Sequence, residues 1–243
     1  MQPPTSPSDS GAAAPAARAV RAVIFDLDGT LLDSEPNYYL ADRDLMARYG
    51  VAFSETDKRR YIGQGIHEQM GDMVRRHGLP VTPEQLIREK ITLYLDIADG
   101  NTVAFPEMVR FLERLDQASV PLAVASGSPT QVIHRLLDGV GLAGKFRALV
   151  STDQGGRGKP EPDVFLEAAR RLGAAPADCL VVEDSGPGVE AAGRAGMACI
   201  AVPYLSEPPL PAVFHQADLL FPEGQAGFDA EAAWAWVEAR LPK

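Results

Sequence analysis

Cysteine and histidine are scarce in this chain. Its 243 residues include two cysteines, Cys179 and Cys199, and four histidines. Both cysteines stand in apolar stretches, which predicts small buried side chains and argues against a disulfide framework. No spacing of cysteine and histidine typical of a zinc site is present. The sequence therefore argues against both a disulfide-stapled secreted domain and a zinc-binding domain.

Long apolar runs and an excess of positive charge are also missing. No run approaches the roughly 18 apolar residues that a membrane helix needs. Residues 1–18 lack the basic and apolar regions of a signal peptide, and their Pro, Ser and Ala content predicts a disordered N-terminal tail. The net charge of −10 argues against a nucleic-acid surface. We expect a cytoplasmic protein that binds neither membranes nor nucleic acid, and nothing in the sequence requires more than a monomer.

Short apolar runs alternating with helical patterns are what the chain does contain. Continuous apolarity suits strands that are covered on both faces, as in a parallel sheet. The five best strand candidates are 21–25, 120–126, 148–151, 179–183 and 198–202. Helices are predicted over 106–117, 129–139, 161–172 and 187–195. This order predicts a doubly wound α/β sheet, in which ligands bind at the carboxyl ends of the strands.

One segment interrupts the alternation of strand and helix. Residues 37–99 hold several helical patterns and no convincing strand, which predicts an all-helical insertion of about 60 residues. We therefore expect a core of residues 19–35 and 101–243, with a helical cap domain over residues 36–100.

Two acids follow the first predicted strand. Asp26 and Asp28 are two residues apart in the sequence DLDGT, a spacing that lets both side chains point the same way. One carboxylate could act as a nucleophile while its neighbour transfers a proton. Alternatively, the pair binds a metal through hard oxygen ligands, or it belongs to an ordinary Asp-Gly turn.

Polar residues follow three further predicted strands. Ser126 and Gly127 precede a predicted helix, where a hydroxyl and free backbone N–H groups make an anion site, while Ser128 suits the role of helix cap. Lys159 offers a compact cation for phosphate or is a solvated surface lysine. Glu183 and Asp184 end an apolar strand, and Asp184 or Ser185 would also serve as a helix cap. Because all these residues fall at strand ends of one parallel sheet, a single site explains them better than four unrelated features.

These motifs resemble the haloacid dehalogenase-like superfamily. DLDGT resembles its first motif, Ser126 its second, Lys159 in GKPEPD its third and VVEDS its fourth, in order over residues 21 to about 203. The helical insertion is similar to the first type of cap domain in that family. The resemblance implies a Rossmann-like core with an inserted helical cap, which acts on phosphorylated metabolites.

The resemblance also implies a role for each matching residue. Asp26 would be the nucleophile that becomes an aspartyl-phosphate, and Asp28 the general acid and base. Mg²⁺ would be held by Asp26, the backbone carbonyl of Asp28 and Asp184, with Glu183 behind them or bound through water. The phosphoryl oxygens would be held by Thr30, Ser126, Gly127 and Lys159.

Three functions are compatible with the sequence. The first is a Mg²⁺-dependent phosphatase of a small phosphorylated metabolite such as a sugar phosphate. The second is a mutase similar to β-phosphoglucomutase, which the sequence favours less because Tyr38 stands where such mutases have a histidine and Ile66 or His67 where they have an arginine. The third is an idle phosphate- or metal-binding protein.

The cap contributes fewer predictions than the core. Gly65 and His67 are candidate residues for substrate specificity, because they lie in the segment that resembles the specificity loop of the family. Asp33 and Glu35 lead into the cap, and we expect them to be structural or hinge residues.

Overall fold

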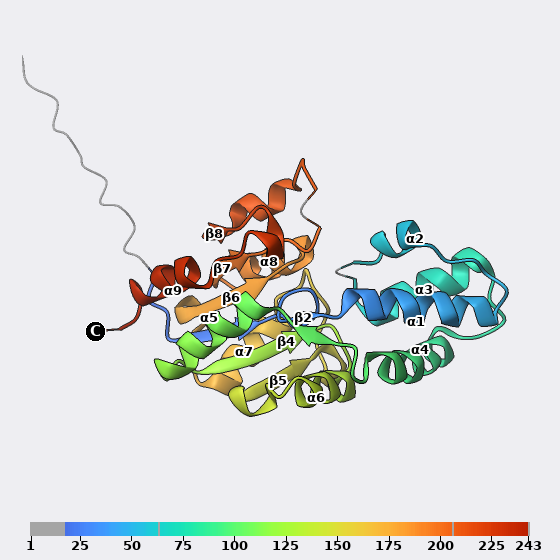
Figure 1. Cartoon of the computed structure of the whole chain (residues 1–243), viewed down its shortest axis with the longest axis horizontal. Coiled ribbons are helices and arrows are strands. Elements are labelled where there is room, and N and C mark those ends of the chain that lie inside the picture. Colours follow the sequence, from blue (N-terminus) through green and yellow to red (C-terminus); the bar gives the residue numbers. More distant parts are fainter. Residues whose placement is uncertain (1–17, 63, 206, 243) are drawn as a thin grey trace, which may run out of the picture.

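The apolar runs of the sequence form the parallel strands of one sheet (Figure 1). This computed structural model describes residues 18–62, 64–205 and 207–242, so the predicted N-terminal tail lies outside the described residues except for Arg18. In spatial order the strands are β5 (Ala148–Ser151), β4 (Leu122–Ser126), β1 (Ala22–Phe25), β6 (Cys179–Glu183), β7 (Ala198–Ala201) and β8 (Leu219–Leu220). The predicted bounds of the five runs hold to within two residues. The short edge strand β8 was not predicted.

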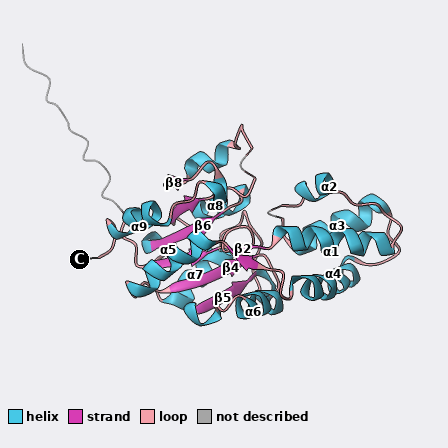
Figure 2. Ribbon diagram, viewed as in Figure 1, coloured by secondary structure: helices cyan, strands magenta, loops and turns pink. Residues whose placement is uncertain are grey.

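Helices cover both faces of the sheet, as Figure 2 shows. Within β1, Val23 and Phe25 pack into one hydrophobic cluster, whereas Ala22 and Ile24 pack into the other. The first cluster is completed by α5 (Pro106–Gln117), α6 (Thr130–Gly139) and α9 (Ala230–Glu238). The second is completed by α7 (Asp163–Leu172) and α8 (Gly186–Arg194). Burial of both faces explains why the strands are continuously apolar.

The carboxyl ends of the strands meet at one edge of the sheet. β1 pairs in parallel with β4 on one side and with β6 on the other, and the ladder extends one step further because the Asp26 N–H donates to the Val182 carbonyl at 2.9 Å. Asp26 therefore leaves the sheet beside Ser126, the last residue of β4, and Glu183, the last residue of β6.

A separate helical lobe is inserted after β1. It consists of α1 (Glu35–Arg48), α2 (Glu55–Arg59), α3 (Ile66–His77) and α4 (Pro83–Ala98). Two antiparallel strands, β2 (Leu32–Asp33) and β3 (Val103–Ala104), join the lobe to the sheet. The lobe has its own buried cluster, which includes Leu45, Met46, Met70, Met73 and Leu86. Figure 1 shows the lobe beside the sheet rather than stacked on either face of it.

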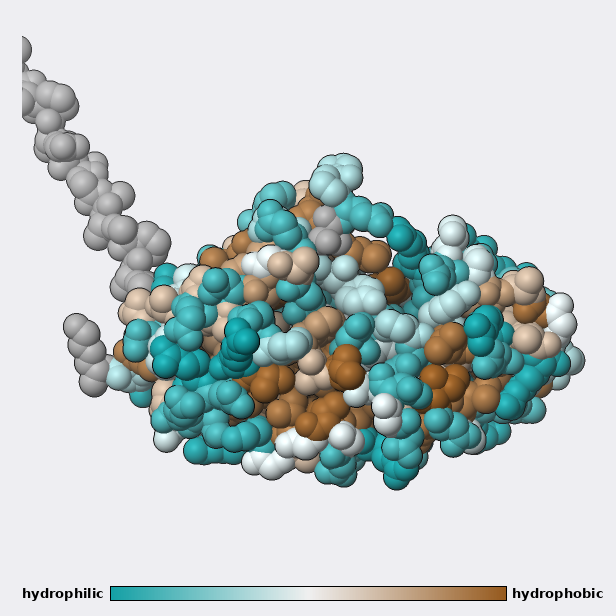
Figure 3. All heavy atoms as spheres, in the orientation of Figure 1, coloured by the Kyte–Doolittle hydropathy of each residue, from teal (hydrophilic) through white to brown (hydrophobic). Residues whose placement is uncertain are grey.

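The predicted fold class, a doubly wound parallel sheet with an inserted helical cap, is confirmed. Cys179 and Cys199 are buried and free, as expected. Hydrophilic side chains cover most of the face shown in Figure 3, and hydrophobic ones form smaller patches on both lobes. In the described part of the chain, no helix combines the length and apolarity of a membrane span.

Candidate active site

A cavity of about 110 Å³ lies between the strand ends and the helical lobe. The core contributes Asp26, Asp28, Ser126, Gly127, Lys159 and Asp184 to its lining. The lobe contributes Glu35, Tyr38, Lys58, Gly65, Lys90 and Tyr94, among others. The structure therefore gathers most of the residues that the sequence assigned to separate strand ends.

Lys159 joins the first and fourth motifs. Its ammonium group contacts Asp26 Oδ1 and lies 2.5 Å from Glu183 Oε1. The Lys159 side chain is only 8% exposed, so it is not a solvated surface lysine. Burial lowers the pKa of Lys159, but the two carboxylates outweigh this effect and raise the pKa above its ordinary value. Lys159 is thus a permanent cation inside the site.

Asp26 lies among other acids. Burial raises the pKa of its carboxyl to about 8, with further upward contributions from Glu183 and Asp28 and a downward one from Lys159. Repulsion between buried carboxylates and the loss of hydration both favour the protonated acid. A bound cation would reverse that preference.

Glu183 is fixed by the beginning of α8. Its Oε2 accepts from the backbone N–H groups of Asp184 and Ser185, both at 2.8 Å, and from Ser185 Oγ at 3.0 Å. A Cβ on Gly188 would lie 1.9 Å from the Glu183 carboxyl group, so only glycine leaves room for this carboxylate. The helix is capped by Ser185, whose hydroxyl accepts from the Gly188 N–H, and not by Asp184.

Asp184 is held in place by Thr30 and Gly29 of the first motif. Thr30 Oγ1 donates to Asp184 Oδ1 at 2.8 Å, and both residues are buried. Gly29 has a φ of +81°, and a Cβ there would lie 2.5 Å from Asp184 Oδ2. Burial raises the pKa of Asp184 well above its ordinary value, and Glu183 and Asp26 add to the rise. Thr30 orients Asp184 and does not line the cavity.

The donor set fits a hard divalent cation such as Mg²⁺. Asp26, Glu183 and Asp184 are buried together, and Lys159 is the cation that contacts Asp26 and Glu183. Oxygen ligands suit Mg²⁺, and a second positive charge would offset the repulsion that raises these pKa values. Within the described residues, no three side chains of His, Cys, Asp or Glu form a metal site on their own. The predicted ligand set differs from such a cluster because it includes the main-chain carbonyl of Asp28.

Asp28 is surrounded by hydroxyl groups. Ser34 Oγ donates to its Oδ1 at 2.7 Å, while Ser128 Oγ and Ser126 Oγ donate to its Oδ2 at 2.6 and 3.3 Å. Burial raises the pKa of Asp28, and the serine hydrogen bonds partly oppose that rise. The Tyr38 hydroxyl from α1 lies 2.7 Å from Ser128 Oγ. A chain of hydroxyl groups thus links the helical lobe to Asp28.

The role predicted for Ser128 as a helix cap is wrong. The cap position of α6 is Pro129, and no side chain of that residue or of Ser128 bonds the helix start. Asp153 takes this role instead, because its Oδ2 accepts from the Thr130 N–H at 2.8 Å. The dipeptide Ser-Pro suggested a cap because it commonly precedes helices, yet the Ser128 hydroxyl turns toward Asp28.

The lobe side of the cavity differs from the sequence expectation. Gly65 lines the cavity, whereas His67 is exposed and lies outside its lining. Glu35, expected to be a structural or hinge residue, lines the cavity instead. Lys58 and Lys90 also line the cavity. The sequence does not predict this position, because lysines on amphipathic helices usually face solvent.

Comparison with known proteins places this arrangement in a family. Residues 20–196 match the family model described as haloacid dehalogenase-like hydrolase. Because the match spans more than half of the chain, the chain belongs to that family, and the predicted resemblance is confirmed.

Two curated relatives are named as phosphatases. A fructose-1-phosphate phosphatase of Escherichia coli is 31% identical over 183 residues, which cover 75% of this chain and 96% of the relative. The bifunctional riboflavin kinase/FMN phosphatase of Arabidopsis thaliana is 35% identical over 184 residues. These cover 75% of this chain but only 48% of that relative, so the match spans about half of the bifunctional protein. The predicted enzyme class, a phosphoric monoester hydrolase of this family, is confirmed.

A solved structure supports the fold. The β-phosphoglucomutase of Clostridium difficile superposes with a TM-score of 0.76 at 21% identity, covering 90% of this chain and 98% of that one. At this identity the likeness concerns the fold and not the reaction.

Proposed function

We propose that this protein is a Mg²⁺-dependent phosphatase that hydrolyses a small phosphorylated metabolite, a sugar phosphate, through an aspartyl-phosphate on Asp26. The observation that carries the proposal is the buried carboxylate of Asp26, which contacts Lys159 at the strand ends and faces the cavity. The relative named as a fructose-1-phosphate phosphatase supports a sugar phosphate, and the relative named as an FMN phosphatase supports the wider class of small phosphorylated metabolites.

The proposed reaction has two steps. In the first, an Asp26 carboxylate oxygen bonds to phosphorus while the ester P–O bond breaks, and Asp28 gives its proton to the departing alcohol. In the second, Asp28 takes a proton from water, the water oxygen bonds to phosphorus, and the bond from phosphorus to Asp26 breaks. Inorganic phosphate leaves and Asp26 is regenerated. The covalent intermediate replaces one difficult step with two easier ones.

The roles of the other site residues are assigned from their charges, their hydrogen bonds and their place in the cavity lining. We assign Mg²⁺ to Asp26, the Asp28 carbonyl and Asp184, where it would neutralise charge on the phosphoryl oxygens. Lys159 offsets the repulsion between the Asp26 carboxylate and the phosphate dianion. Ser126 and Gly127 line the cavity and are assigned to the phosphoryl oxygens. Thr30 acts through Asp184, because its hydroxyl donates to that carboxylate.

The two lobes are assigned different roles, because residues of both line the cavity. We propose that residues 19–35 and 101–243 form the catalytic core and residues 36–100 the cap. The cap closes over the strand ends and excludes water until the phosphoenzyme is ready to be hydrolysed. A monomeric, cytoplasmic enzyme stays a prediction.

Phosphate release tests the proposal. With Mg²⁺ present, wild type is expected to release phosphate from p-nitrophenyl phosphate and from members of a panel of sugar phosphates. Asp26→Asn is expected to lose about 10⁴-fold in kcat, because the nucleophile is gone. Asp138→Asn, at an exposed position of α6, is the matched control and is expected to retain full activity. Equal inactivity of wild type and Asp26→Asn across the panel would instead support the idle binding protein.

The reaction product distinguishes the mutase alternative from the proposed phosphatase. A mutase interconverts hexose phosphate isomers without net release of phosphate, whereas the proposed phosphatase releases one phosphate for each ester consumed.

A further inference from the structure

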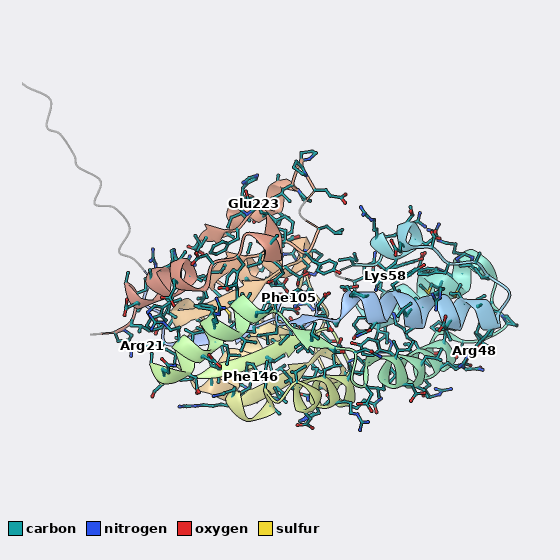
Figure 4. All side chains as sticks on the ribbon, viewed as in Figure 1. Arg21, Arg48, Lys58, Phe105, Phe146 and Glu223 are labelled. Carbon is teal, nitrogen blue, oxygen red and sulfur yellow. The ribbon has the colours of Figure 1, made fainter. Side chains whose placement is uncertain are left out.

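Lys58 and Glu35 form a buried ion pair that lines the cavity on the side of the helical lobe. Lys58 Nζ lies 3.2 Å from Glu35 Oε2, and the two side chains are 9% and 12% exposed. Glu35 begins α1 and Lys58 lies on the short helix α2. Figure 4 shows Lys58 at the end of the lobe that faces the core.

This pair is incompletely satisfied. Glu35 Oε2 is buried, and among the described residues it has no hydrogen-bond partner. The other carboxylate near Lys58 is Asp42, at 3.6 Å. Buried charged groups without hydrogen bonds are costly, so such groups beside a cavity are suited to bind a ligand.

Lys90 provides the contrast within the same lobe. Its ammonium group lies 2.7 Å from Asp42 Oδ1 and donates to Gln69 Oε1 at 2.7 Å. Gln69 in turn donates to Asp42 Oδ2 at 2.8 Å. Asp42 Oδ1 also has no hydrogen-bond partner among the described residues, but Asp42 does not line the cavity, whereas Glu35 does. The unpartnered carboxylate oxygen of Glu35 is therefore the one that belongs to a residue of the cavity wall.

We infer that Lys58 and Glu35 form a subsite that binds hydroxyl groups on the organic part of the phosphate ester, with Lys58 donating and Glu35 accepting. This inference rests on the proposed function and deepens it, because it names a polyol phosphate as the preferred substrate class. The pair discriminates substrates and takes no part in the transfer of the phosphoryl group.

Charge and position favour hydroxyl groups over other ligands. The two lysines of this wall, Lys58 and Lys90, are matched by Glu35 and Asp42, so the wall has no surplus positive charge for a second phosphate. A hydroxyl group is both donor and acceptor and can satisfy the ammonium and the carboxylate together. The subsite also lies close to the reacting groups, because Glu35 and Lys58 line the same cavity as Asp26 and Asp28.

Matched esters test the inference. Sorbitol 6-phosphate and n-hexyl phosphate have the same carbon number, and glycerol 3-phosphate and n-propyl phosphate form a shorter pair. Wild type is expected to have a kcat/KM at least about 10-fold higher for the polyol ester of a pair, because an alkyl chain leaves the buried charges without partners. Phosphate release is measured for all four esters.

Variants of Lys58 and Glu35 then test whether this pair causes the preference for polyol esters. Lys58→Met is expected to lower kcat/KM for the polyol ester about 10- to 100-fold, mainly through KM, and to change that for the alkyl ester less than about threefold. The double variant Lys58→Gln/Glu35→Gln removes both charges together and leaves no unpaired ion, so it serves if the single variant fails to fold. Its preference for polyol esters is expected to fall by a similar factor.

Arg59→Met is the matched control on the same helix. Arg59 is exposed and pairs with Glu207 outside the cavity, so this variant is expected to retain the preference for polyol esters. Wild type that hydrolyses both members of a pair equally well would overturn the inference, as would folded variants that lose activity equally on both. Wild type inactive on all four esters and on p-nitrophenyl phosphate would instead overturn the proposed function.

Discussion

The two walls of the cavity are built by different means. Much of the core wall lies at the carboxyl ends of parallel strands, so the backbone ladder of the sheet fixes where Asp26, Ser126 and Asp184 lie. The wall of the helical lobe consists of side chains from separate helices, such as Glu35 and Lys58, whose positions depend on how those helices pack.

The walls also differ in charge balance. In the core, Lys159 contacts two buried carboxylates, those of Asp26 and Glu183. Asp28 and Asp184 are two further acids of this wall, and the pKa values of Asp26 and Asp184 are raised. In the lobe, Lys58 and Lys90 are matched by Glu35 and Asp42. The core wall therefore favours an added cation and a phosphate, whereas the lobe wall offers hydrogen bonds without a net charge. The difference indicates that the core wall carries out phosphoryl transfer, whereas the lobe wall recognises the organic part of the substrate.

Removal of the metal has the largest expected effect, and it concerns the core wall. After treatment with a chelator, activity on both polyol and alkyl phosphates is expected to fall at least about 100-fold and to return when Mg²⁺ is added. Binding of Mg²⁺ to the phosphate-free protein is also expected to raise Tm, because the cation relieves repulsion between buried carboxylates. Full activity in the chelated protein would contradict the charge argument for the core wall.

Lys159→Met is the next test. Loss of the buried cation is expected to lower kcat/KM about 10²- to 10³-fold, by a similar factor for polyol and alkyl esters, because Lys159 acts on the phosphoryl group. Lys145→Met is the control, since the Lys145 side chain is 39% exposed and pairs with Asp116, and neither residue lines the cavity. A loss confined to polyol esters would show that the two walls do not divide reaction from recognition.

The sequence predicted the core wall better than the lobe wall, and the reason is local geometry. Strand-end residues such as Asp26 and Asp184 could be found because a parallel sheet brings all its carboxyl ends to one edge. Lys58 and Glu35 could not, because helical periodicity identifies a face but not the element that packs against it. Ser128 was misassigned because its neighbour Pro129 resembled the start of a helix. β8 escaped detection because a two-residue strand has no periodic pattern.

Lys90→Met tests the structural side of the lobe wall. It removes the cation that pairs with buried Asp42 and donates to Gln69, and is expected to lower the free energy of unfolding by about 3–5 kcal/mol. Denaturant unfolding measures this change. Lys58→Met is expected to cost less, because Lys58 is less tightly held. Equal losses of stability in the two variants would remove the distinction between the two lysines.

Ser128→Ala has a small expected effect on the rate. It deletes the 2.6 Å hydrogen bond to Asp28 and the contact with Tyr38, and is expected to lower kcat about 5- to 10-fold, equivalent to roughly 1 kcal/mol. Tyr38→Phe keeps the bond between Ser128 and Asp28 and is expected to lower kcat less. An effect of Tyr38→Phe larger than that of Ser128→Ala would place Tyr38 in direct contact with the substrate.

The central claim is that Asp26 carries the phosphoryl group during turnover. Enzyme denatured during steady-state hydrolysis of a sugar phosphate is reduced with borohydride, which converts an aspartyl-phosphate to homoserine, and the peptides are analysed by mass spectrometry. The account predicts homoserine at position 26 that requires substrate and Mg²⁺ and is absent in Asp26→Asn. Homoserine at position 28 or 184, with none at position 26, would contradict it.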